Sequence, residues 1–155
     1  MKFESKEDID APIQQVFEML TDFDGFERAA LRRGAEVQRV DELEEIGPGV
    51  AWDLSFMMRG KLRNIRLTLS EYDPPNGMLF IGGGQGLEGQ LVLELVALSR
   101  TRTRMTLAIE LSATTLAARL VLQSLKLGRS KIQSKFHLRV ADFATELEER
   151  YKRTA

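Results

Sequence analysis

The spacing of hydrophobic positions changes from a strand repeat to a helical repeat near the N-terminus. From Phe3 to Ile9, apolar and polar residues alternate loosely, which predicts a strand with one buried face. A helical repeat of apolar residues follows, formed by Ile13, Val16, Phe17 and Leu20. Thr21 and Asp22 offer a helix cap, and the apolar residues after them predict a second short helix that ends near Gly34.

After Gly34, short apolar segments are separated by turn-forming residues, and no helical run interrupts them. This alternation of short apolar segments and turns is typical of an antiparallel meander. The strongest turn signal is Asp73-Pro74-Pro75-Asn76-Gly77, and Arg59-Gly60 predicts a tight hairpin. Counting the N-terminal strand, we expect seven strands, and the last six cover residues 35–40, 50–58, 63–72, 78–81, 90–98 and 105–111.

The C-terminal third is helical, but its apolar face changes direction. A stripe at helical spacing comprises Ile132, Phe136, Val140, Phe143, Leu147 and Tyr151. In residues 116–127 the polar positions point the opposite way if one unbroken helix is assumed, and Gly128 lies where the phase changes. The sequence therefore predicts a break at Gly128, which would leave residues 116–127 as a separate apolar flap.

Alternation along the strands assigns an inner, apolar face to the predicted sheet. A sheet that curls around a helix has a concave side, and a cavity for an apolar guest remains if the helix does not fill it. The alternative is a fully packed core. The predicted inward positions are Phe3, Ser5, Trp52, Leu54, Phe56, Met58, Leu67, Leu69, Leu91, Leu93, Leu95, Met105, Leu107, Ile109, Phe136, Val140 and Phe143. A bulge near 61–64 or 78–86 would invert this assignment locally.

The composition limits the kinds of catalytic and metal sites that the chain can form. The chain of 155 residues has no cysteine, which excludes disulfides, thiolate nucleophiles and cysteine-based zinc or iron-sulfur sites. His137 is the one histidine, so metal sites with two or three histidines are excluded as well. We expect no metal ion and no other cofactor.

Charge and hydropathy bear on location and partners. Five of the first eight residues are charged, and this segment lacks the apolar core of a secretory signal. No apolar run approaches the roughly 18 residues of a membrane span. We therefore expect a cytoplasmic protein. The net charge of −1 gives no overall field that would recruit nucleic acid. Residues 111–141 contain no acid but several basic residues, which indicates a solvated helix face or a patch for phosphate or lipid headgroups.

Few polar residues are candidates for chemistry. Glu7 is the one acid that alternation places on the inner face, where it could act as a general acid or base, or reach water or an arginine near the strand end. Tyr72 and Ser5 could orient a guest through hydrogen bonds, although structural roles are the alternative. His137 flanks the apolar stripe of the last helix, as a partly exposed structural histidine would.

The segment from Gly84 to Gly89 matches the dinucleotide-binding pattern G-x-G-x-x-G. That pattern requires a strand before it and a helix after it, whereas the residues that follow alternate as a strand does. We therefore interpret this segment as a flexible hairpin at the rim of the pocket.

Two short motifs resemble a known superfamily. Between Ile9 and Asp22, an apolar strand end, Ala11-Pro12, Val16-Phe17 and Leu20-Thr21-Asp22 occur in the order of the family's opening motif, and Tyr72-Asp73-Pro74-Pro75 resembles its central turn. Over nearly its whole length the chain is similar to the START and pollen-allergen-like superfamily, and within it to bacterial polyketide cyclase/dehydrase and lipid-transport proteins. The resemblance implies an α+β helix-grip fold, in which a curved seven-stranded antiparallel sheet surrounds a long C-terminal helix.

Three functions remain open, with residues 1–155 expected to form a single domain. The first is binding or carriage of a hydrophobic small molecule, such as a lipid, an isoprenoid, a quinone or a polyketide-like compound. The second is a cyclase or dehydratase that uses Glu7, Tyr72 or His137. The third is an assembly factor or a factor in peripheral contact with a membrane, which would present residues 116–127 to its partner.

Overall fold

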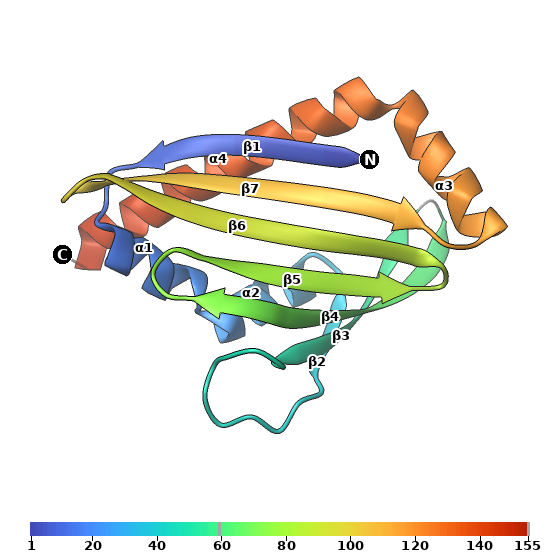
Figure 1. Ribbon diagram of the computed structural model, residues 1–155, viewed down its shortest axis with the longest axis horizontal. Helices are drawn as coiled ribbons and strands as arrows, with labels where there is room; N and C mark the ends of the chain where they lie inside the picture. Colours follow the sequence, from blue (N-terminus) through green and yellow to red (C-terminus); the bar gives the residue numbers. More distant parts are fainter. Residues whose placement is uncertain (59, 155) are drawn as a thin grey trace.

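A computed structural model describes residues 1–58 and 60–154 (Figure 1). Seven strands form one antiparallel sheet in the order β1-β7-β6-β5-β4-β3-β2, and four helices accompany it in the described residues. Of the predicted Arg59-Gly60 hairpin, Arg59 lies outside the described residues. The elements are β1 (Lys2–Ile9), α1 (Ile13–Leu20), α2 (Phe23–Arg32), β2 (Glu36–Arg39), β3 (Ala51–Met58), β4 (Lys61–Asp73), β5 (Gly77–Gly84), β6 (Leu87–Ser99), β7 (Arg102–Ala113), α3 (Leu116–Leu127) and α4 (Arg129–Thr154).

The architecture is the expected helix-grip fold. The long helix α4 runs along one face of the curved sheet beside β1 (Figure 1). Its apolar stripe buries Val140, Ala144 and Leu147 in the core. At the other end of β1, the rings of Phe3 and Phe136 lie 6.4 Å apart, which extends this contact along the strand. Burial of these apolar side chains holds the helix on the sheet.

The predicted break at Gly128 is confirmed. Helix α3 ends at Leu127, Gly128 occupies its C-cap, and α4 begins at Arg129. Thr115 caps the start of α3, because its hydroxyl accepts a hydrogen bond of 3.2 Å from the backbone N–H of Ala118. Figure 1 shows α3 at an angle to α4, at the end of the sheet where β7 finishes.

Two short helices close the opposite side of the concave face. Helix α1 buries Val16, Phe17 and Leu20, as the helical repeat predicted. Asp22 caps α2 by accepting a hydrogen bond of 3.3 Å from the backbone N–H of Gly25. This cap fixes where α2 begins and therefore which of its side chains face the sheet.

A β-bulge lies in β4, away from the two places where the sequence left the strand parity open. Leu69 pairs with Phe80 and Glu71 pairs with Leu79, so Ser70 is the extra residue. After the bulge the inward positions shift by one, and Tyr72 turns toward the core. Its ring centroid lies 5.5 Å from that of Phe17.

Strand β5 is longer than predicted. The expected segment ended at Ile81, whereas the observed strand continues to Gly84 through the glycine run. Glycine suits this position because a Cβ at Gly84 would collide with the backbone of Asn64 on β4. The turn consists of Gln85 and Gly86, both with positive φ, as a tight two-residue hairpin requires. The resemblance to a dinucleotide loop is therefore only a resemblance in sequence.

None of the helices in the described ranges combines the length and apolar composition needed to cross a membrane.

Candidate functional site: an apolar pocket beneath α2

The concave face of the sheet is not completely filled. A pocket of about 290 Å³ remains between α2, the inner faces of β2 to β7 and one side chain of α4. Its size is close to the lower end of the range typical of small-molecule sites. The lining consists of Leu20, Phe23, Phe26, Glu27, Ala30, Val37, Trp52, Leu54, Leu67, Met78, Phe80, Leu91, Leu93, Leu107 and Phe143.

Three aromatic rings form one wall of the pocket. Phe23 from α2 meets Trp52 from β3 edge-on, with ring centroids 5.1 Å apart, and meets Phe80 from β5 at 6.2 Å. Trp52 and Phe80 are also 6.2 Å apart. Edge-to-face contacts of this kind add to the stabilisation from burial, so the three rings support one another in this wall.

Glu27 is the one charged residue among the described residues that line the pocket. Its Oε1 accepts a hydrogen bond of 2.7 Å from the indole Nε1–H of Trp52. The carboxylate thereby satisfies the polar atom of the indole, and the ring can present an apolar surface. The contact joins α2 to β3 and positions the tryptophan in the wall.

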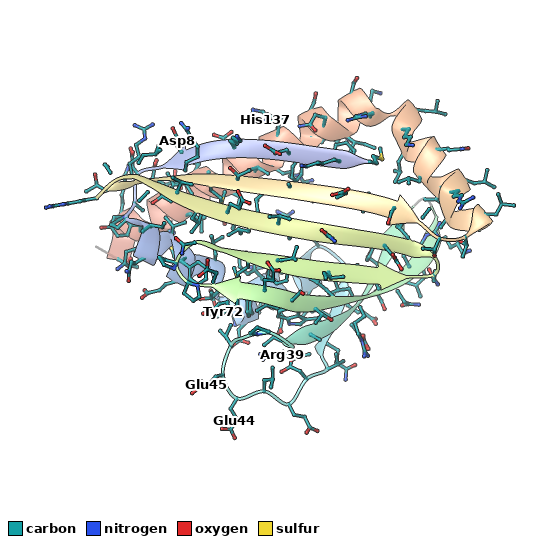
Figure 2. All side chains as sticks on the ribbon, in the orientation of Figure 1. Asp8, Arg39, Glu44, Glu45, Tyr72 and His137 are labelled. Carbon is teal, nitrogen blue, oxygen red and sulfur yellow. The ribbon has the colours of Figure 1, made fainter. Side chains whose placement is uncertain are left out.

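Arg39 lies over the ring of Trp52. Its guanidinium carbon lies 6.0 Å from the ring centroid, and its Nε and Nη2 donate to Asp41 at 2.7 and 3.1 Å (Figure 2 labels Arg39). The hydrogen bond from Arg39 holds the pKa of the Asp41 carboxyl well below its usual range, and the backbone N–H of Ala51 adds to this effect. Asp41 thus anchors both the cation and the start of β3.

The predicted lining residues fall into three groups. Seven of them line the pocket: Trp52, Leu54, Leu67, Leu91, Leu93, Leu107 and Phe143. Phe56 and Met58 line a separate void of about 20 Å³ under α3, together with Ala118 and Val121. The remaining eight lie outside the described lining of either cavity: Phe3, Ser5, Leu69, Leu95, Met105, Ile109, Phe136 and Val140.

Sequence reasoning missed the helical wall of the pocket. Phe23, Phe26, Glu27 and Ala30 lie at spacings of three and four residues, which places them on one face of α2. The apolar residues of this face predict a helix, but their spacing alone does not predict that the face borders a pocket. Met78 and Phe80 were also missed, because the glycine run left the parity of β5 undetermined. Leu20 and Val37 complete the set of lining residues that were not predicted.

The candidate polar residues do not gather in the pocket. Ser5 shares a hydrogen bond of 2.8 Å with Nδ1 of His137, and Nε2 of His137 lies 3.9 Å from Oε1 of Glu7. This group connects β1 to α4, and Figure 2 shows His137 on the helix beside β1. Tyr72 packs against Phe17 at another part of the core. None of the four is among the described residues that line the apolar pocket.

The flexible hairpin expected at the rim of the pocket is also placed elsewhere. Its turn residue Gln85 borders the small void under α3. The carbonyl of Gly86 accepts a hydrogen bond of 2.8 Å from the backbone N–H of Thr114. The tight turn is therefore attached to the chain that leads into α3 and does not border the main pocket.

No metal site complements the pocket within the described part of the chain. In residues 1–58 and 60–154, no three His, Cys, Asp or Glu side chains are grouped so that they could hold a metal ion.

Solved structures share this fold at low sequence identity. A protein from Thermus thermophilus, TTHA0849, is 18% identical with a TM-score of 0.68, and the match covers 100% of this chain and 99% of that one. The Zhui aromatase/cyclase from Streptomyces sp. R1128 is 15% identical with a TM-score of 0.67, covering 97% and 95%. A START superfamily protein from Mycobacterium smegmatis is 8% identical with a TM-score of 0.58, covering 86% and 95%. At these identities, the likeness concerns the fold.

Among curated protein sequences, none matches this chain significantly. A family model does match, and it covers residues 1–148, which is nearly the whole chain. The motif between Ile9 and Asp22, the helix-grip fold and the pocket on its concave face agree with that match. The chain belongs to the family described as polyketide cyclase/dehydrase and lipid transport.

Proposed function

We propose that this protein binds or carries a hydrophobic small molecule in the pocket beneath α2, as a cytoplasmic protein. The observation that carries the proposal is the pocket of about 290 Å³, whose described lining is apolar except for Glu27. Glu27 already accepts the indole N–H of Trp52, so the wall offers a guest mainly hydrocarbon surface. Burial of that surface would supply the affinity, at about 25 cal/mol per Å².

The arrangement of polar side chains favours a carrier over a cyclase or dehydratase. An enzyme of that kind needs an acid or base within hydrogen-bond reach of its substrate. Glu27, the one carboxylate in the described lining, already accepts the indole N–H of Trp52. Glu7 and His137 lie together between β1 and α4, and Tyr72 packs on Phe17, and none of the three is among the described residues around the apolar space. A lipid, isoprenoid, quinone or polyketide-like guest would fit the lining chemistry.

A series of linear alcohols tests the proposal. Trp52 is the single tryptophan of the chain and lines the pocket, so its emission reports on binding without a label. Each added methylene is worth about 0.8 kcal/mol, so the affinity is expected to rise about fourfold per carbon until the pocket is full.

A variant with a filled pocket gives the control. Leu54→Phe with Leu91→Phe should fold normally and lose this dependence on chain length. Native mass spectrometry of protein from its own host, followed by extraction, would identify a natural guest. No uptake of alcohols and a clean apo mass would overturn the proposal.

A second candidate function, contact with an anionic membrane surface, rests on α3. Its side chains Leu116, Leu120 and Leu127 are 74%, 60% and 92% exposed. Arg119 and Lys126 lie on the same helix, in a part of the chain that has no acidic residue. Exposed leucines beside basic residues are the pattern of a helix that lies on anionic lipids.

Sedimentation with phosphatidylglycerol vesicles tests this contact. Wild-type protein should sediment at low salt, and Leu120→Asn with Leu127→Asn should remain in solution. The matched control is Leu62→Asn with Val96→Asn, which removes two exposed apolar side chains from the sheet. Equal sedimentation of both double variants would contradict a role for α3.

A further inference from the structure

An arginine-rich cleft lies between α2 and α4. Figure 1 shows that both helices lie on the same side of the sheet. Six arginines line it, three from the α2 segment and three from α4: Arg28, Arg32, Arg33, Arg139, Arg150 and Arg153. Three carboxylates belong to the same lining: Asp22, Asp142 and Glu146. The cleft therefore carries an excess of positive charge in a protein whose net charge is −1.

Most of this positive charge is not neutralised within the cleft. Arg150 donates to Asp22 at 3.2 Å. Among the residues that the structure describes, no carboxylate lies within ion-pair distance of the other arginines of the cleft. Guanidinium groups bind phosphate and carboxylate through paired, charge-assisted hydrogen bonds. Arginines that face one another across a cleft are therefore suited to a bound anion.

The cleft and the apolar pocket share part of their lining. Phe26 and Ala30 of α2 and Phe143 of α4 border both. The rings of Phe26 and Phe143 are 5.8 Å apart and span the space between the two helices. An apolar chain that occupies the pocket can therefore end beside these rings, where the arginines begin.

We propose that the guest is an amphiphile, whose hydrocarbon chain fills the apolar pocket and whose phosphate or carboxylate head binds in the arginine-rich cleft. The inference rests on the proposed function, because it adds the head group to the guest that the pocket accepts. It explains why a cluster of arginines adjoins a wall that is otherwise apolar.

Three probes separate the two sites. Decyl phosphate carries both chain and anion, decanol carries the chain alone, and inorganic phosphate carries the anion alone. Each is titrated by calorimetry at low ionic strength and below micelle formation, with Trp52 emission followed in parallel. We expect decyl phosphate to bind at least about tenfold more tightly than decanol, since one charge-assisted hydrogen bond supplies a difference of that order. Inorganic phosphate alone should bind much more weakly than decyl phosphate.

A charge-reversal pair assigns the preference to the cleft. Arg32→Glu with Arg139→Glu changes one exposed arginine on each wall and should abolish the preference for the phosphate while leaving decanol binding unchanged. Lys61→Glu with Arg100→Glu makes the same change of charge at exposed positions of the β-hairpins and should keep the preference.

Each other outcome is informative. Equal binding of decyl phosphate and decanol to the wild-type protein overturns the head-group site and leaves the carrier function standing. Absence of binding by both chains overturns the proposed function itself. Inorganic phosphate that binds as tightly as decyl phosphate makes the cleft a site for a free anion and overturns the amphiphile. A preference that survives Arg32→Glu with Arg139→Glu places the head elsewhere and also overturns the inference.

Discussion

The concave face of the sheet has two halves that differ in how they are covered. Along β1, α4 lies directly on the sheet, and Met105 of the neighbouring β7, Val140 and Leu147 are at most 3% exposed. Along β3 to β6, the cover is the short helix α2, and Leu54, Leu67 and Leu91 remain partly exposed around the pocket. Both halves carry the same kind of apolar side chain. The cover above the sheet, more than the composition of the sheet, therefore decides where a guest can bind.

Truncation of a core side chain gives the largest expected difference between the halves. Met105→Ala should lower the free energy of unfolding by about 2 to 5 kcal/mol, because the side chain is fully buried and its neighbours cannot close the space. Leu91→Ala at the pocket wall should cost at most about half as much, since part of its surface already faces open space. Urea unfolding of the two variants measures both values. Equal costs would mean that the pocket is closed in solution.

The polar support of the aromatic wall should have a smaller effect. Glu27→Ala removes the acceptor of the Trp52 indole N–H and should cost about 1 kcal/mol of stability. Glu27→Gln keeps an acceptor oxygen and should therefore preserve most of this stability. Urea unfolding gives the stability, and Trp52 emission shows whether the ring has moved. Equal destabilisation by both substitutions would show that charge, not the hydrogen bond, holds the wall.

The ion pair between Asp41 and Arg39, beside Trp52, should have the smallest effect on stability, and this effect depends on pH. The pKa of Asp41 is depressed in the folded protein, so the ionised carboxyl stabilises the fold above its unfolded pKa of about 3.9, and this contribution is lost as the pH falls through the lower, folded value. Asp41→Asn should therefore lower the Tm at neutral pH, with the difference from wild type shrinking below about pH 4.

Glu44→Gln is the control, because Glu44 lies on the same loop and is exposed (Figure 2). A difference that Asp41→Asn shows equally at every pH, or that Glu44→Gln reproduces, would contradict this assignment to the Asp41 carboxyl.

Much of the fold could be predicted because it depends on local patterns. Strand alternation gave the seven strands, the cap at Asp22 gave the start of α2, and the change of phase at Gly128 gave the break between α3 and α4. These signals are contained in short windows of sequence. The boundary of β5 was wrong, because three successive glycines have no side chains from which a strand period can be read.

The candidate site could be predicted only in part, since its position depends on contacts between distant segments. Alternation assigns Leu54, Leu91 and Leu107 to the inner face, but it does not say how far α4 extends over them. The contact between Glu27 and Trp52 joins residues 25 positions apart, so neither local pattern predicts it. The arginine-rich cleft likewise requires the two helices to be placed side by side.

The surplus residue Ser70 in β4 has a consequence for the shape of the whole molecule. A bulge bends its strand and increases the local twist, and this one lies where β4 pairs with β5, in the middle of the sheet. The curl that makes room for a guest is thus partly encoded in the length of one strand and not only in the chemistry of its side chains. A relative that lacked this residue would have a flatter sheet, and with it a shallower hollow.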